Sequence, residues 1–236
     1  MNRDAMKRKF RLPMITLAML ALLAGAIAAY GTVKSEVSAQ LGFETTPVGI
    51  RVTSIEPVWD FEDQGGGFVM NPQKRGTSTL VRSHDGLQVN IDTEDLPAGA
   101  YTVWWFFFNK PSLCSDGNCG IYNDSLPPPG NVAAGTSVAW ATGGIVGPDR
   151  QGHFSASVGI GVEGTARGVL WGPGLVDPFT TEVHIEVRYH GNAAWDDLDL
   201  LMQQITNVGG NCNAESFGAE PNTFHCYGVQ ATAHQP

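Results

Sequence analysis

Two histidines and a carboxylate share one face of a predicted strand, and these residue types bind metals in proteins. Side chains alternate along residues 182–190, so one face holds His184, Glu186, Arg188 and His190. A strand rises about 3.3 Å per residue, which puts His184 and His190 roughly 20 Å apart, too far for one ion. A metal site would therefore need His184, Glu186 and a third ligand such as His153 or His225. Arg188 opposes a cation there, so a solvated or cross-strand-paired polar face is the simpler interpretation.

An aromatic run at residues 101–108 is the second candidate for chemistry. On a strand, Trp104, Phe106 and Phe108 face away from Trp105 and Phe107. Open to water, the first three side chains would form a ligand-binding platform that stacks on sugar rings or other flat apolar ligands. Covered by residues 110–135 or by a helix near residue 195, both faces would be interior. Exposed patches of large aromatic side chains are uncommon in monomers, which favours burial.

Sequence signatures of common enzymes are missing. The chain has no GxSxG, no HExxH and no GxxxxGK[ST]. Residues 159–164 match the letters of a dinucleotide-binding fingerprint, but a turn and a strand are expected after them rather than a helix. The catalytic residues, if there are any, are unknown from the sequence, and a triad assembled from distant Ser, His and Asp residues stays open.

Four cysteines predict two disulfides. Cys114 and Cys119 flank Asp116-Gly117, a favoured two-residue turn, which places the two Cα atoms roughly 4.5 Å apart. Cys212 and Cys226 would form the other pair, near the C-terminus. Zinc is the alternative use of four cysteines, but neither spacing is CxxC.

The rest of the chain reads as short strands separated by turns, because 29 Gly and 14 Pro interrupt it. The expected strands lie at residues 49–55, 67–70, 78–83, 87–91, 101–108, 138–142, 154–161, 168–171, 182–189 and 226–232. One helix is expected at residues 195–205, capped by Asn192 and ended by Gly209-Gly210. Its predicted core face consists of Trp195, Leu198, Leu201, Met202 and Ile205.

The N-terminus reads as an export signal. Five basic residues precede an apolar stretch at residues 12–29, and small residues follow it. An uncleaved membrane anchor is the alternative, since about 17 apolar residues is the short end of a bilayer span. The formal net charge is −9; without residues 1–29, which hold five basic residues and one acidic residue, it would be −13. Such an acidic protein is not expected to bind nucleic acid or an anionic membrane surface.

Three further features are the segments at residues 96–114, 141–156 and 182–191. Together they resemble a family of exported prokaryotic β-sandwich proteins without an assigned activity. A weaker similarity is to copper–zinc superoxide dismutase-like and chordin-type β-sandwich repeats, which share small-residue strands and Gly-rich turns. The chain lacks the His-x-His ligands of those dismutases, so the similarity implies no dismutase activity.

Together these observations predict an all-β protein: an antiparallel, Greek-key-like β-sandwich with one short C-terminal helix and two disulfides. Residues 1–29 would be the signal or anchor, 30–45 a linker and 46–236 one domain, secreted, periplasmic or held at the cell surface. The expected function is non-enzymatic binding or a structural role in the cell envelope or extracellular space, with an envelope or extracellular ligand. No cofactor is expected. The alternatives are a metal-assisted enzyme that uses His184 and Glu186, and a carbohydrate-binding module that uses the aromatic face.

Overall fold

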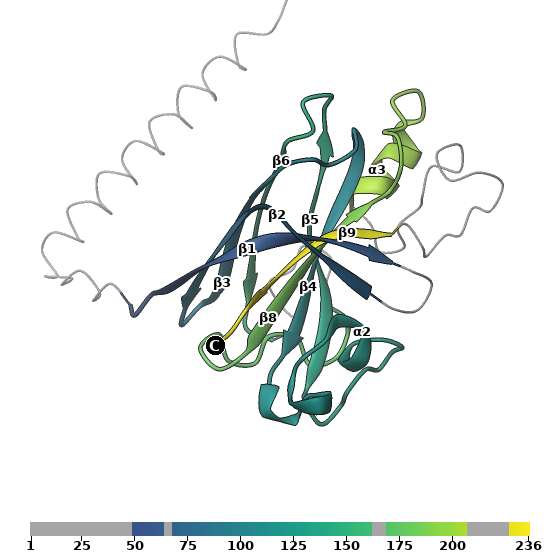
Figure 1. Ribbon diagram of the computed structural model, residues 1–236. Helices are drawn as coiled ribbons and strands as arrows, with labels where there is room; N and C mark the ends of the chain where they lie inside the picture. Colours follow the sequence, from purple (N-terminus) through teal and green to yellow (C-terminus); the bar gives the residue numbers. More distant parts are fainter. Residues whose placement is uncertain (1–48, 64–67, 162–168, 207–226) are drawn as a thin grey trace, which may run out of the picture. The chain divides into compact units, whose positions relative to one another are not determined.

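The strands form one antiparallel sheet in the order β6-β3-β2-β1-β9-β8-β4-β5-β7 (Figure 1). The computed structural model describes residues 49–63, 68–161, 169–206 and 227–236, and all described strands belong to the compact unit Ile50–Pro236. The strand bounds are β1 Val52–Asp63, β2 Phe68–Ser83, β3 Gly86–Thr93, β4 Gly99–Phe108, β5 Thr136–Val146, β6 Gly152–Gly159, β7 Val169–Trp171, β8 Glu182–Tyr189 and β9 Gly228–His234. The helical segments are η1 Pro111–Leu113, η2 Ser115–Gly117, α2 Ile121–Asp124 and α3 Leu198–Thr206.

The predicted antiparallel β architecture is confirmed, with one sheet where a sandwich would have two. The sheet curls, because β5 and β6 are joined by five residues although they lie seven positions apart in the strand order. Phe154 of β6 consequently packs beside Gly144 of β5, where an added Cβ would lie 3.3 Å from its ring. The curl encloses the main core, which includes Leu80, Trp105 and Ile185.

The two segments predicted as strands at residues 67–70 and 78–83 are parts of one strand, β2. Turn residues between them, including Gly76, suggested a break. The structure accommodates them within the ladder by register shifts on either side of Trp59 in the partner strand β1. A bulge of this kind lets a strand continue past residues that would interrupt regular pairing.

The predicted helix exists, but its cap and its buried face differ from the prediction. Asp197 caps α3, since its Oδ1 accepts a hydrogen bond from the Leu200 amide at 3.0 Å, so the assignment of Asn192 as the cap was wrong. Leu201 and Gln204 are the buried side chains of α3. Trp195, Leu198 and Met202, expected in the core, are exposed, because Gln204 uses the buried face to bind the backbone of residues 190–194.

The predicted disulfide between Cys114 and Cys119 is present, with Cα atoms 4.9 Å apart. Asp116 and Gly117 have φ of 54° and 76°, and the Asn118 amide donates to the Ser115 carbonyl at 3.1 Å. These are the features of a type I′ turn, as predicted from the two residues at its centre, although no strands flank it.

Other predictions concern residues outside the described ranges. These are the signal or anchor at 1–29, the linker at 30–45, and the Cys212–Cys226 pair. Within the described ranges, no helix has the length and apolar character needed to cross a membrane.

Candidate functional site

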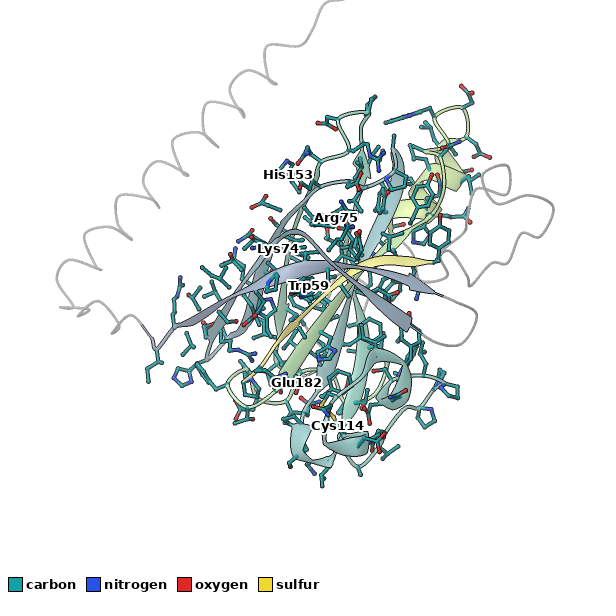
Figure 2. The ribbon with its side chains drawn as sticks, viewed as in Figure 1. Trp59, Lys74, Arg75, Cys114, His153 and Glu182 are labelled. Carbon is teal, nitrogen blue, oxygen red and sulfur yellow. A yellow bond between two sulfur atoms is a disulfide. The ribbon has the colours of Figure 1, made fainter. Side chains whose placement is uncertain are left out.

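One face of β8 carries the polar residues that the sequence singled out. Glu182, His184, Glu186 and Arg188 alternate with the buried Val183, Ile185 and Val187. The adjacent strand β4 presents Phe108, Phe106, Trp104 and Thr102 opposite these four residues. At one end of this face Glu182, labelled in Figure 2, pairs with Phe108, the last residue of β4, before the chain enters the segment that contains α2.

Glu182 and His184 bind each other. Glu182 Oε1 lies 2.6 Å from His184 Nε2, and the two side chains are 7% and 13% exposed. The His184 imidazole also meets the Phe108 ring edge-on, with centroids 4.9 Å apart. These contacts orient the imidazole and occupy one of its two nitrogens.

Glu186 has different partners from His184. Its Oε1 accepts hydrogen bonds from Arg188 at 2.9 Å and from the Tyr122 hydroxyl at 3.1 Å, and the side chain is fully buried. Burial lowers the pKa of Arg188, but Glu186 and Tyr122 outweigh burial and raise it, so the guanidinium stays charged. Glu186 is therefore half of a buried ion pair rather than an open ligand.

Among the described residues, the geometry brings no third metal ligand to His184 and Glu186. His153 lies on β6, where its Nδ1 is 2.8 Å from Asp92, and His225 lies outside the described ranges. Within the residues that the structure describes, no three His, Cys, Asp or Glu side chains are grouped to hold a metal ion.

Trp104, Phe106 and Phe108 do not form an open ligand-binding platform. Their exposed fractions are 8%, 3% and 0%, because residues between β4 and β5 cover them. The covering residues include Cys114, Ile121 and Ala134, which pack with the three aromatic side chains in a second core. The burial that the sequence favoured is therefore observed, and the alternative of an open platform formed by these three side chains is wrong.

Asp124 holds the covering segment together. Its buried carboxylate accepts hydrogen bonds from the Ser115 amide, the Gly120 amide and the Asn131 side chain, at 2.8 to 3.0 Å. Burial raises the pKa of Asp124, but these donors outweigh burial and lower it. The Asp124 carboxylate therefore links Ser115 and Gly120, which follow the two cysteines of the disulfide loop, with Asn131.

A row of aromatic and polar side chains crosses the sheet beside this cover. Trp104 pairs with Trp140 of β5 on one side and with Glu186 of β8 on the other, so the three side chains lie on the same face. Trp171 of β7 pairs with Val138, which lies two residues from Trp140 along β5. Trp140, Trp171 and Tyr122 are partly exposed and pack against the second core.

Several buried polar atoms along this row lack a hydrogen-bond partner among the described residues. They are Nε1 of Trp140, Nε1 of Trp171, Oε2 of Glu186 and Nε of Arg188. Trp104 differs, since its Nε1 donates to Thr102 Oγ1 at 2.8 Å. Buried polar atoms without partners cost free energy and are rare in folded proteins, so this row has unused hydrogen-bonding capacity.

The sequence pattern singled out Glu186 but not Tyr122, which donates a hydrogen bond to it, nor Trp140 and Trp171, which lie further along the same row. Alternation in residues 138–142 does place Trp140 on one face with Val138 and Thr142, which was the available signal. Tyr122 comes from an irregular segment whose path no periodicity indicates. A search of protein-family models found no match to this chain, and a search of curated proteins found none either.

Proposed function

We propose that the protein is an exported, non-enzymatic binding module of the cell envelope or extracellular space, and that it binds carbohydrate at the row that contains Trp140, Trp171 and Glu186. The observation that carries this proposal is the set of unpartnered polar atoms among partly exposed aromatic rings. Small-molecule sites combine apolar and aromatic walls with a few polar groups in this way.

Carbohydrate suits both properties of the row. A sugar ring offers an apolar face to an indole, and its hydroxyl groups accept hydrogen bonds from indole N–H groups and donate them to a carboxylate. Because the four unpartnered atoms are buried, the ligand would engage them after a small displacement of the covering segment or of Arg188, whose side chain is 22% exposed.

A binding role, rather than catalysis, also suits the hydrogen bonding of the polar side chains on β8. Glu182 with His184, and Glu186 with Arg188 and Tyr122, are engaged with one another. We further infer that the two walls of the curled sheet correspond to the layers of a sandwich, and that Cys212 pairs with Cys226.

Co-sedimentation with insoluble cell-envelope polysaccharide from the producing cells tests the proposal. We expect Trp140→Ala to weaken binding at least tenfold, equivalent to about 1.4 kcal/mol, because the side chain supplies both stacking surface and a donor. Glu186→Gln should weaken it by a similar factor. The matched control is Trp195→Ala, which removes an exposed tryptophan on the chain before α3.

Near-ultraviolet circular dichroism of each variant separates lost binding from lost folding. Wild-type affinity in folded Trp140→Ala would overturn the proposed site. Equal loss in Trp140→Ala and Trp195→Ala would also overturn it, because the loss would then not be specific to this row.

A further inference from the structure

The surface at the start of α3 carries an apolar cluster that faces solvent. Trp195 is 65% exposed, Leu198 68% and Met202 50%. Leu198 and Met202 are four residues apart in the helix and so lie on one face, and Trp195 is in the turn just before it. We call these three residues the α3 apolar surface.

The helix that presents this surface is firmly attached to the sheet. The Gln204 side-chain amide donates to the carbonyl oxygens of His190 and Asn192 at 2.9 and 3.0 Å, and its oxygen accepts from the Ala194 amide at 3.0 Å. A Cβ atom on Gly143 of β5 would lie 1.7 Å from the Ile205 carbonyl oxygen, so only glycine permits this approach. The α3 apolar surface is therefore preorganised, which lowers the entropic cost of binding.

Negative charge borders the α3 apolar surface. Asp196, Asp197 and Asp199 are exposed, and residues 191–206 contain no Lys or Arg. A binding surface with an apolar centre and a charged rim selects a partner with the same apolar centre and a rim of opposite charge.

We propose that the α3 apolar surface docks into a different protein that offers an apolar groove bordered by Lys and Arg. Tryptophan is enriched among residues that dominate interface energies, and a helix face inserted in a groove is a recurring recognition mode. A second copy of this chain fits poorly, because a symmetric contact would bring the aspartates of both copies together. The same aspartates disfavour an anionic lipid surface. This inference does not rest on the carbohydrate proposal.

Photo-cross-linking in the producing cells tests the docking surface. The probe is p-benzoylphenylalanine at position 202 of the full chain, with the same probe at the exposed position 88 on β3 as the control. We expect a discrete adduct with a different protein from position 202, whose cross-linked peptide is apolar and flanked by Lys or Arg.

Further substitutions in the variant that carries the probe at position 202 test whether the adduct depends on the α3 apolar surface. Leu198→Asp should reduce the adduct at least tenfold, and the double variant Asp196→Lys, Asp199→Lys should reduce it and invert its response to salt. Trp140→Ala and Asp85→Lys, which alter the carbohydrate row and a distant turn, should leave it unchanged.

An adduct with a second copy, with lipid or with residues 207–226 of the same chain would overturn the proposal. So would the absence of an adduct, or an adduct that persists in folded Leu198→Asp. Loss of polysaccharide binding in Trp140→Ala bears on the carbohydrate row alone, so the two proposals can fail independently.

Discussion

Asp95 and Arg150 hold each other although both have a left-handed backbone conformation. Their φ values are 64° and 60°. One guanidinium nitrogen of Arg150 lies 2.5 Å from Asp95 Oδ1 and 3.0 Å from the Asp95 carbonyl oxygen. Asp95 also accepts from Arg75 at 2.8 Å, and Arg75 in turn binds Asp60. The turns after β3 and before β6 are therefore linked by side chains whose own backbones are conformationally unfavourable.

Comparison of Arg150→Ala with Arg150→Gly separates the contribution of the ion pair from the free-energy cost of the positive φ at residue 150. Both variants lose the pair, which is worth up to about 1 kcal/mol because both side chains are partly exposed. Glycine also removes the cost of a positive φ, so we expect Arg150→Gly to be more stable than Arg150→Ala by about 1 kcal/mol. Urea denaturation measures the difference. Equal midpoints would mean that this backbone cost is absent.

His234 makes stability depend on pH. Its buried imidazole lies between Ser54 Oγ at 2.8 Å and Ser78 Oγ at 2.9 Å. Burial, with added repulsion from Arg82 and His184, lowers its pKa from 6.5 to about 4. The unfolded chain therefore binds a proton below pH 6.5 that the folded protein does not bind until about pH 4. The free energy of unfolding should fall across that interval, by on the order of 3 kcal/mol in total.

His234→Gln tests the assignment because glutamine keeps hydrogen-bonding capacity without titrating. Urea midpoints measured from pH 7.5 to 4.5 should fall less steeply in His234→Gln than in the wild type. Parallel pH profiles for the two proteins would rule out His234 as the source of the dependence.

Asp124→Asn should loosen the covering segment between β4 and β5. The asparagine would lose the charge that three donors stabilise and would turn an N–H group toward one of them, at a cost of roughly 2 kcal/mol. In the wild type, the contribution of the Asp124 carboxylate to the free energy of unfolding is complete above the ordinary aspartate pKa. It is lost as pH falls through the lowered pKa of Asp124. Urea denaturation and the rate of proteolysis within residues 109–135 measure the effect.

The control for Asp124→Asn is Asp116→Asn in the same segment. Asp116 is exposed, and asparagine tolerates its positive φ, so this variant should match the wild type. Similar loss of stability in both variants would mean that removing any negative charge destabilises the segment, and that the hydrogen bonds of Asp124 are not the cause.

Local patterns predicted those parts of the fold that depend on neighbours in sequence. The alternation in residues 87–91 and 182–189 identified β3 and β8, and Asp116-Gly117 identified the disulfide turn. The buried face of α3 was mispredicted because Gln204 is held by backbone groups that no periodicity reveals.

The candidate site shows the same limit. The sequence placed His184 and Glu186 on one face of β8, as the structure has them. Which side chains they bind depends on the path of the covering segment and on the pairing of β4 with β5 and β8. Tyr122 approaches Glu186 from 64 positions away, a relationship set by tertiary structure alone.

The position of β9 has a consequence for how the chain folds. This last strand lies between the two groups β6-β3-β2-β1 and β8-β4-β5-β7, and among the described strands it provides their hydrogen-bonded connection. During synthesis, β1 and β8 therefore remain unpaired edges until residues 228–234 are available. Unpaired edges promote association between chains, and pairing over such a long sequence separation slows folding. The interval before β9 inserts is when newly made chains are most prone to aggregate.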